Sequence, residues 1–131
     1  LGTITRDHLL SLPHKPYLLI PIPLSSARYR ARGYNQVREV AHVACADIEH
    51  VTLTENILQR IKHTAPQTEL NKEARLKNIE NAFRVTHPEK ISSAHIILLD
   101  DVVTTGGTLH EASRELQKHN PASVTLVAIA H

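Results

Sequence analysis

The sequence is poor in several residue types that characterise particular classes of protein. Its 131 residues include one cysteine and four glycines, with no methionine and no tryptophan. One cysteine allows neither an internal disulfide nor a cysteine-based zinc site, so we expect a reducing, cytoplasmic environment. No apolar run approaches the roughly 20 residues of a membrane span, and no basic-then-apolar leader opens the chain. We therefore expect no membrane insertion.

The remaining composition is that of an ordinary globular domain. Hydrophobic residues make up 41% of the chain and charged residues 21%, as in typical folded domains. With 131 residues the chain is large enough for one core and too short for two comfortable ones, which predicts a single domain over residues 1–131. The net charge of +2 is weak support for binding nucleic acid. Because the chain begins with Leu1 and has no methionine, we interpret it as a piece of a longer protein.

Cys45 and the ten histidines are residues whose type alone could suggest chemistry. Cys45 falls on the apolar face of a predicted helix, so we interpret it as a core thiol rather than a nucleophile. The histidines show no metal-ligand spacing such as i, i+4 on one helix face, so we expect most of them at the surface.

Hydrophobic patterning predicts strands that alternate with helices. Apolar residues at i, i+3, i+4 and i+7 predict an amphipathic helix over 37–48, and further helices are predicted over 6–12, over 72–79 and from just after Gly107 to near 120. Strands are predicted over 17–20, 56–61, 82–85, 96–99 and 123–130, with a loop over 62–70. This alternation implies an α/β fold with a mainly parallel, twisted sheet flanked by helices.

The strongest functional signal begins at the predicted strand 96–99. Asp100 and Asp101 follow it, and we expect them to emerge at the carboxyl edge of the sheet, where ligands bind in open α/β sheets. Residues 104–108 then combine hydroxyls, glycines and unpaired backbone N–H groups at a helix start, which suits a phosphate. Together they indicate a ligand with sugar hydroxyls and a phosphate. No lysine follows the glycines and the G-x-G-x-x-G spacing is missing, which excludes a Walker P-loop and a dinucleotide fingerprint.

Residues 98–108 resemble the loop that binds phosphoribosyl diphosphate (PRPP) in type I phosphoribosyltransferases. Two further segments, and the doubled Val-Val-Thr-Thr-Gly of this loop, are similar to the ComF/GntX-like branch of that family, which is associated with competence and DNA uptake in bacteria. The segments are Pro21-Ile22-Pro23 with Arg30-Ala31-Arg32-Gly33-Tyr34-Asn35-Gln36, and a scattered set of Arg60, Thr64, Gln67, Leu70, Arg75, Asn78, Ala82 and Phe83. The resemblance covers roughly residues 17–130 and implies the type I phosphoribosyltransferase fold.

The resemblance also implies roles for individual residues. Asp100 and Asp101 would hold the ribose hydroxyls, and Mg²⁺ would be bound through PRPP rather than by a set of protein ligands. The residues implied to bind PRPP are Asp100, Asp101, Val102, Val103, Thr104, Thr105, Gly106, Gly107 and Thr108. Those implied on the diphosphate side are Pro23, Leu24, Arg30 and Arg32, and those implied in catalysis are Asp100, Asp101, Lys62 and Arg75. The segment from Lys62 to Leu70 matches the flexible loop that closes over the reaction centre.

The implied function is transfer of ribose 5-phosphate from PRPP to an acceptor that the sequence does not identify. Thr104 stands where purine-salvage members carry an acidic residue, so activation of the acceptor by that carboxylate is not expected. The alternative is a non-catalytic module of the DNA-uptake machinery that binds PRPP or nucleic acid, with single-stranded DNA or a competence protein as partner. Tyr29 and Tyr34 would suit stacking on bases, although packing on the sheet edge is the preferred interpretation. The Cys-rich zinc module that typically begins full-length members is not among these 131 residues, by truncation or by nature, and a homodimer is left open.

Overall fold

The computed structural model describes residues 2–23, 36–61, 73, 80–102 and 107–130 of the chain. The helices are α1 (Gly2–Ser11), α3 (Gln36–Cys45), α5 (Pro88–Ile91) and α6 (Gly107–Gln117). The strands are β1 (Tyr17–Pro21), β2 (Val51–Leu53), β3 (Leu58–Arg60), β4 (Phe83–Val85), β5 (His95–Val102) and β6 (Ser123–Ala130). None of the helices in these ranges has the length and apolar character needed to cross a membrane.

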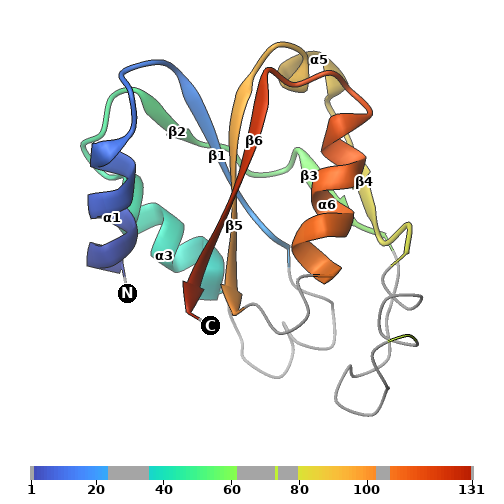
Figure 1. Cartoon of the computed structure of the whole chain (residues 1–131), viewed down its shortest axis with the longest axis horizontal. Helices are drawn as coiled ribbons and strands as arrows, with labels where there is room; N and C mark the ends of the chain where they lie inside the picture. Colours follow the sequence, from blue (N-terminus) through green and yellow to red (C-terminus); the bar gives the residue numbers. More distant parts are fainter. Residues whose placement is uncertain (1, 24–35, 62–72, 74–79, 103–106, 131) are drawn as a thin grey trace.

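A parallel sheet forms the centre of the fold (Figure 1). Its strand order is β2-β1-β5-β6, and each neighbouring pair is parallel. In this register Ile97 of β5 lies between Leu19 of β1 and Thr125 of β6. β3 and β4 pair separately as an antiparallel two-stranded sheet. The predicted α/β fold with a mainly parallel sheet is therefore confirmed, and the antiparallel pair adds a feature that the alternation of strands and helices did not predict.

β5 is buried on both faces, as its continuous apolar run predicts for a central parallel strand. Four residues in the middle of this strand, Ile96, Ile97, Leu98 and Leu99, are each at most 1% exposed. Because side chains alternate along a strand, Ile96 and Leu98 join one core cluster, whereas Ile97 and Leu99 join the other. The sheet therefore separates two hydrophobic cores.

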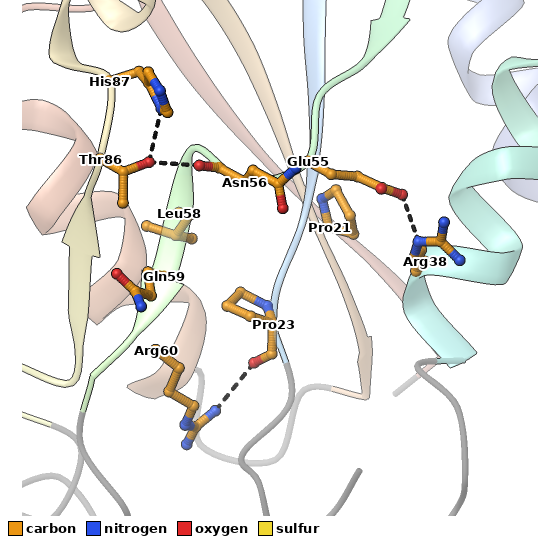
Figure 2. A pocket seen from close by; sticks show the side chains of 10 residues that line it. All are labelled: Pro21, Pro23, Arg38, Glu55, Asn56, Leu58, Gln59, Arg60, Thr86 and His87. Carbon is orange, nitrogen blue, oxygen red and sulfur yellow. Dashed lines mark hydrogen bonds and ion pairs between the residues drawn. The ribbon is translucent and has the colours of Figure 1, made fainter.

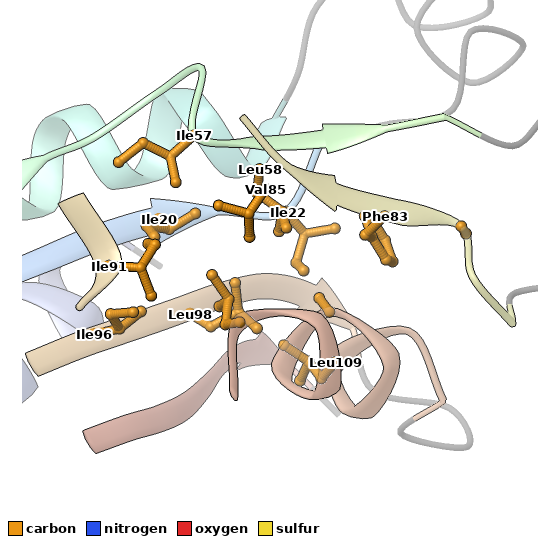
Figure 3. Close-up of a cluster of buried hydrophobic side chains, with 13 residues drawn as sticks. Ile20, Ile22, Ile57, Leu58, Phe83, Val85, Ile91, Ile96, Leu98 and Leu109 are labelled. Carbon is orange, nitrogen blue, oxygen red and sulfur yellow. The ribbon is translucent and has the colours of Figure 1, made fainter. Parts of the chain in front are cut away.

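The two cores are covered by different elements (Figures 1 and 3). α1 and α3 cover one face, where the cluster consists of Leu9, Tyr17, Leu19, Val37, Ala41, Ala44, Ile48, Val51, Ile97 and Leu99. α5, α6 and the β3–β4 pair cover the other face, where the cluster consists of Ile20, Ile22, Ile57, Leu58, Ala82, Phe83, Val85, Ile91, Ile96, Leu98, Leu109, Ala112 and Leu116. The helices use the residues spaced three and four apart that predicted them, such as Val37, Ala41 and Ala44 of α3.

The topology reverses direction between β1 and β5. From β1 the chain passes through α3 to β2 on one side of β1, and it later returns to β5 on the other side. The carboxyl ends of β1 and β5 are therefore neighbours at a topological switch point, which is where ligands bind in open α/β sheets. The backbone N–H of Ile22 donates to the carbonyl of Leu99 over 2.9 Å, which extends this contact beyond the end of β1.

Several boundaries differ from those predicted from the sequence. β2 was not predicted, because a strand of three residues with one exposed side chain, Thr52, is too short to show a period. α1 begins at Gly2 rather than at residue 6, and α3 ends at Cys45 rather than at 48. β5 continues to Val102, so both aspartates lie within the strand and not after it.

Candidate functional site

The carboxyl end of β5 carries the two aspartates that were predicted for the site. Asp100 is half-buried and lies opposite Ala128 of β6, and the backbone of Asp101 continues the strand to Val102. Burying a carboxylate is costly unless polar partners or solvent satisfy it, which favours a position at the rim of the sheet. The predicted location at the carboxyl edge is confirmed for the backbone of both residues.

α6 begins five residues after the end of β5. Gly107 is buried at its first position, and Thr108 is half-buried beside it. The first N–H groups of a helix have no intrahelical acceptor, and the helix dipole places partial positive charge there. Gly107 and Thr108, the last two residues of the predicted PRPP loop, are thus at a helix start, and this end of α6 can attract an anion.

The end of β1 forms the opposite wall of the switch point. Pro21 lies opposite Leu99, the Ile22 N–H donates to the Leu99 carbonyl, and Pro23 follows directly after them. Neither proline has a backbone N–H, which suits a strand end where pairing stops. The structure therefore brings the predicted diphosphate-side residue Pro23 and the predicted ribose-side residue Asp100 to the same edge.

Other predicted site residues lie outside the described ranges. They are Leu24, Arg30, Arg32, Lys62, Arg75, Val103, Thr104, Thr105 and Gly106. Their predicted roles on the diphosphate, in catalysis and in the PRPP loop therefore remain predictions.

A pocket of about 590 Å³ lies beside the end of β1 (Figure 2). Its lining residues come from β1, α3, the turn between β2 and β3, β3 and the residues after β4; they are Pro21, Pro23, Arg38, Glu55, Asn56, Leu58, Gln59, Arg60, Thr86 and His87. Pro23 was predicted at the site, and Arg60 belongs to the motif set quoted above. Pro21 belongs to the quoted Pro21-Ile22-Pro23 segment, and the other lining residues carry no motif, because segments from residue 21 to residue 87 come together only in the folded chain.

Hydrogen bonds and ion pairs hold several of the polar side chains that line this pocket. Arg38 Nε lies 2.6 Å from Glu55 Oε1, and the pair joins α3 to the turn after β2. Arg60 Nη1 donates to the Pro23 carbonyl over 3.4 Å, while its guanidinium lies 5.3 Å from the centre of the Phe83 ring. Arg60 is therefore positioned by both walls, with its charge next to the diphosphate-side segment.

On the other side of the site, α6 is tied to the start of β4. The backbone N–H of Asn81 donates to Glu111 Oε1 over 2.8 Å, and Arg114 Nη2 donates to Glu111 Oε1 over 2.6 Å and to Asn81 Oδ1 over 3.0 Å. The hydrogen bond from Arg114 is the main reason that the pKa of Glu111 lies below its ordinary value. Because α6 also begins with Gly107 and Thr108, this network helps to position the first turn of the helix.

The described ranges contain no group of three or more histidine, cysteine, aspartate or glutamate side chains that could hold a metal ion. Within these ranges the chain therefore offers no cage of protein ligands for a tightly bound cation. Mg²⁺ is usually held by one or two carboxylates together with substrate phosphates and water. A carboxylate such as Asp100 at the rim of the sheet fits that mode of binding.

Comparison with curated proteins finds relatives with names from competence and DNA utilisation. The chain is 37% identical over 114 residues to "Competence protein F" of Haemophilus influenzae, covering 86% of the chain and 48% of that protein. It is 32% identical over 122 residues to "DNA utilization protein YhgH" of Salmonella typhimurium, covering 91% and 50%. It is 34% identical to "Competence protein ComFC" of Bacillus subtilis, covering 86% and 44%. The chain thus spans about half the length of the curated relatives it matches.

Comparison with solved structures and with family models agrees with the fold. The chain is similar to hypoxanthine phosphoribosyltransferase from Trypanosoma cruzi in complex with the product IMP, with a TM-score of 0.56, 14% identity, and coverage of 97% of this chain and 60% of that one. At this identity the likeness shows the fold alone. The model of the phosphoribosyl transferase domain matches residues 21–131, which is most of the chain. The chain therefore belongs to the phosphoribosyltransferase domain family and is a ComF-like member of it, as its motifs predict.

Proposed function

We propose that the carboxyl edge of the sheet binds PRPP and that the domain transfers ribose 5-phosphate from it to an acceptor. The observation that carries this proposal is the pairing of Pro21 with Leu99 at the switch point between β1 and β5, two residues before Pro23 and one before Asp100, with the start of α6 close along the chain. PRPP carries a phosphate on one carbon and a diphosphate on another. It therefore needs separate groups for the diphosphate, the ribose hydroxyls and the phosphate, which we assign to the ends of β1 and β5 and the start of α6. Membership of the phosphoribosyltransferase family supports this choice of ligand.

Each wall has a distinct task in this proposal. The carboxylates of Asp100 and Asp101 accept hydrogen bonds from the ribose hydroxyls, and the start of α6 with Gly107 and Thr108 attracts the 5′-phosphate. The segment after Pro23 faces the diphosphate, with Arg30, Arg32, Lys62 and Arg75 as the cations expected from the sequence. Departure of diphosphate leaves positive charge on the sugar, so holding the reactants in place and stabilising the leaving group are the main tasks of the chain.

Mg²⁺ fits this site as a partner of the ligand. Bound through oxygens of PRPP beside Asp100 and Asp101, it would neutralise charge on the diphosphate. Thr104 offers no carboxylate for deprotonating an acceptor. The proposed transfer therefore suits an acceptor that is already nucleophilic.

The cellular role that we propose follows the relatives. Proteins named for competence and DNA utilisation are 31 to 37% identical to this chain. We propose a cytoplasmic role in handling incoming DNA or its breakdown products. Binding to single-stranded DNA through the arginines at 28, 30 and 32 is the alternative activity.

Isothermal titration with PRPP and Mg²⁺ tests the site. Asp100→Asn and Asp101→Asn should each weaken binding about tenfold or more, because each removes a charged acceptor from the ribose hydroxyls. Asp47→Asn is the matched control: Asp47 is exposed in a turn at positive φ, which asparagine also adopts, and its substitution should leave binding unchanged. No heat with the wild-type protein, or equal affinities in all variants, would overturn the proposal.

Turnover needs a separate measurement. Diphosphate release from PRPP across a panel of nucleobases should identify an acceptor. Binding without release for any base would favour the non-catalytic module. In that case, affinity for single-stranded DNA that decreases with salt and falls in the Arg30→Ala, Arg32→Ala double variant would support the nucleic-acid alternative.

A further inference from the structure

The pocket beside β1 lies on the diphosphate side of the proposed PRPP site. Pro21 and Pro23 form one wall, and Ile22 between them is hydrogen-bonded to Leu99, the residue before Asp100. A displacement at the anomeric carbon brings the acceptor in opposite the departing diphosphate. A pocket on the leaving-group side is therefore poorly placed for the acceptor and needs another occupant.

The floor of this pocket suits a flat, apolar surface. Pro21 and Leu58 are buried, and the half-buried Pro23 continues the same wall (Figure 2). The volume of about 590 Å³ lies within the roughly 300–1,000 Å³ of small-molecule sites. It is enough for an aromatic heterocycle together with an attached sugar.

The rim of the pocket carries amide groups of both hydrogen-bonding kinds. Asn56 and Gln59 line the pocket, and both residues are exposed. Asn56 adopts a φ of 66° in the turn between β2 and β3, a conformation that asparagine tolerates well. An amide donates and accepts at adjacent atoms, which matches the mixed edge of a nucleobase.

Arginine side chains line two parts of the pocket. Arg38 pairs with Glu55 at 2.6 Å, and Arg60 lies where the pocket meets Pro23. Contact with the Phe83 ring at 5.3 Å and the bond to Pro23 hold the Arg60 guanidinium at this junction. A phosphate attached to a ligand in the pocket would be attracted to the place where we propose that the diphosphate of PRPP lies.

We propose that this pocket binds a nucleotide, with the base on the proline wall, the base edge on the amides of Asn56 and Gln59, and the phosphate toward Arg60. A nucleotide combines a flat face, a mixed donor and acceptor edge and an anionic end, as the lining requires. Its phosphate would overlap the diphosphate of PRPP, so nucleotide and PRPP would compete. The competition rests on the proposed function, whereas the nucleotide site itself does not.

Direct titration with AMP, GMP, CMP and UMP tests the site. We expect at least one of them to bind. Gln59→Leu should weaken its binding about tenfold, because the hydrogen bonds from the side-chain amide to the base edge are lost while the size of the side chain is kept. Gln117→Leu, at an exposed position on α6, is the matched control and should bind as the wild type does. A thermal unfolding curve for each variant confirms that the fold is retained.

A 5′-nucleotide also resembles the product of the proposed transfer, so the two sites must be separated. Asp100→Asn should weaken PRPP binding and leave nucleotide binding in the pocket intact. Nucleotide binding that responds to Asp100→Asn and not to Gln59→Leu would overturn the inference, as would no binding of any of the four at millimolar concentration. Nucleotide binding that responds to Gln59→Leu in a protein that does not bind PRPP would leave this site standing and reject the proposed function.

The nucleotide could be free or the end of a DNA strand, since the chemistry is the same. A 5′-phosphorylated single-stranded octadeoxynucleotide, titrated beside the mononucleotides, distinguishes these sources. Tighter binding of the strand that Gln59→Leu abolishes would identify a strand end. Tighter binding of the mononucleotide would identify a free metabolite that reports nucleotide supply.

Discussion

At the scale of single residues, Cys45 shows how packing decides chemistry. It ends α3, is half-buried and packs against the core cluster on the α1 and α3 face. Its Sγ donates to the carbonyl of His42 over 3.9 Å. Burial raises the pKa of the thiol above its ordinary value, although nearby backbone hydrogen bonds and Arg6 oppose this effect. The sequence-based interpretation was a buried core thiol, and the structure places Cys45 half-buried at the edge of that core.

We predict that Cys45 reacts slowly with Ellman's reagent at pH 8. The thiolate is the reactive form, and a raised pKa together with half-burial lowers both its fraction and its accessibility. The reaction should speed up several-fold in urea and show a pH midpoint above that of the unfolded chain. A folded protein whose thiol reacts as fast as the urea-unfolded one would contradict this prediction.

At the scale of elements, the polar contacts between α6 and the start of β4 stabilise the wall that carries Gly107 and Thr108. Glu111 is the centre of this network, because its carboxylate accepts hydrogen bonds from both the Asn81 backbone N–H and the Arg114 guanidinium. The Glu115 carboxylate similarly accepts from the Val85 backbone over 3.4 Å and pairs with Lys118 at 3.0 Å. α6 is thus held by polar bonds as well as by its apolar face.

We predict that Glu111→Ala lowers the free energy of unfolding by about 1 kcal/mol at pH 7, since it removes a charge-assisted bond at a site partly open to solvent. The folded pKa of Glu111 is lowered, so its contribution is full above the unfolded-state pKa of about 4.3 and is lost as the pH falls through the folded value. Urea denaturation at several pH values should show the difference from wild type shrinking in acid. Glu49→Ala, at an exposed turn position, should have little effect at any pH.

The elements also show what the sequence could predict. The run 96–99 and the apolar spacing of α3 predicted a buried strand and an amphipathic helix because each is long enough to show its period. The aspartates and the glycine turn beside them predicted a site at the carboxyl edge of the sheet, and that site stays a prediction. β2, with three residues, shows no period, and the antiparallel pairing of β3 with β4 joins residues 58 and 85 across the chain. The pocket could not be predicted for the same reason. Asn56 and Gln59 line it together with Pro21 only because the fold brings these segments together.

At the scale of the whole molecule, one sheet serves two cores. Leu98 and Leu99 are adjacent in β5 and are both 0% exposed, yet they belong to clusters on opposite faces. The strand backbone that joins them is also the one that ends in the proposed ribose-binding aspartates. A loss of packing on either face should therefore destabilise the entire sheet and the proposed site at its edge.

We predict that Leu98→Ala and Leu99→Ala each lower the free energy of unfolding by about 2–5 kcal/mol, because each leaves a cavity in a close-packed core. The matched control is Leu126→Ala, which truncates a β6 side chain that is 37% exposed and lies opposite Leu98 in the register; it should cost less than about 1 kcal/mol. If the sheet unfolds as a unit, either core variant should reduce hydrogen-exchange protection in both α3 and α6 by the same free energy. Reduced protection in α6 alone for Leu98→Ala, with α3 unchanged, would show instead that the two faces unfold independently.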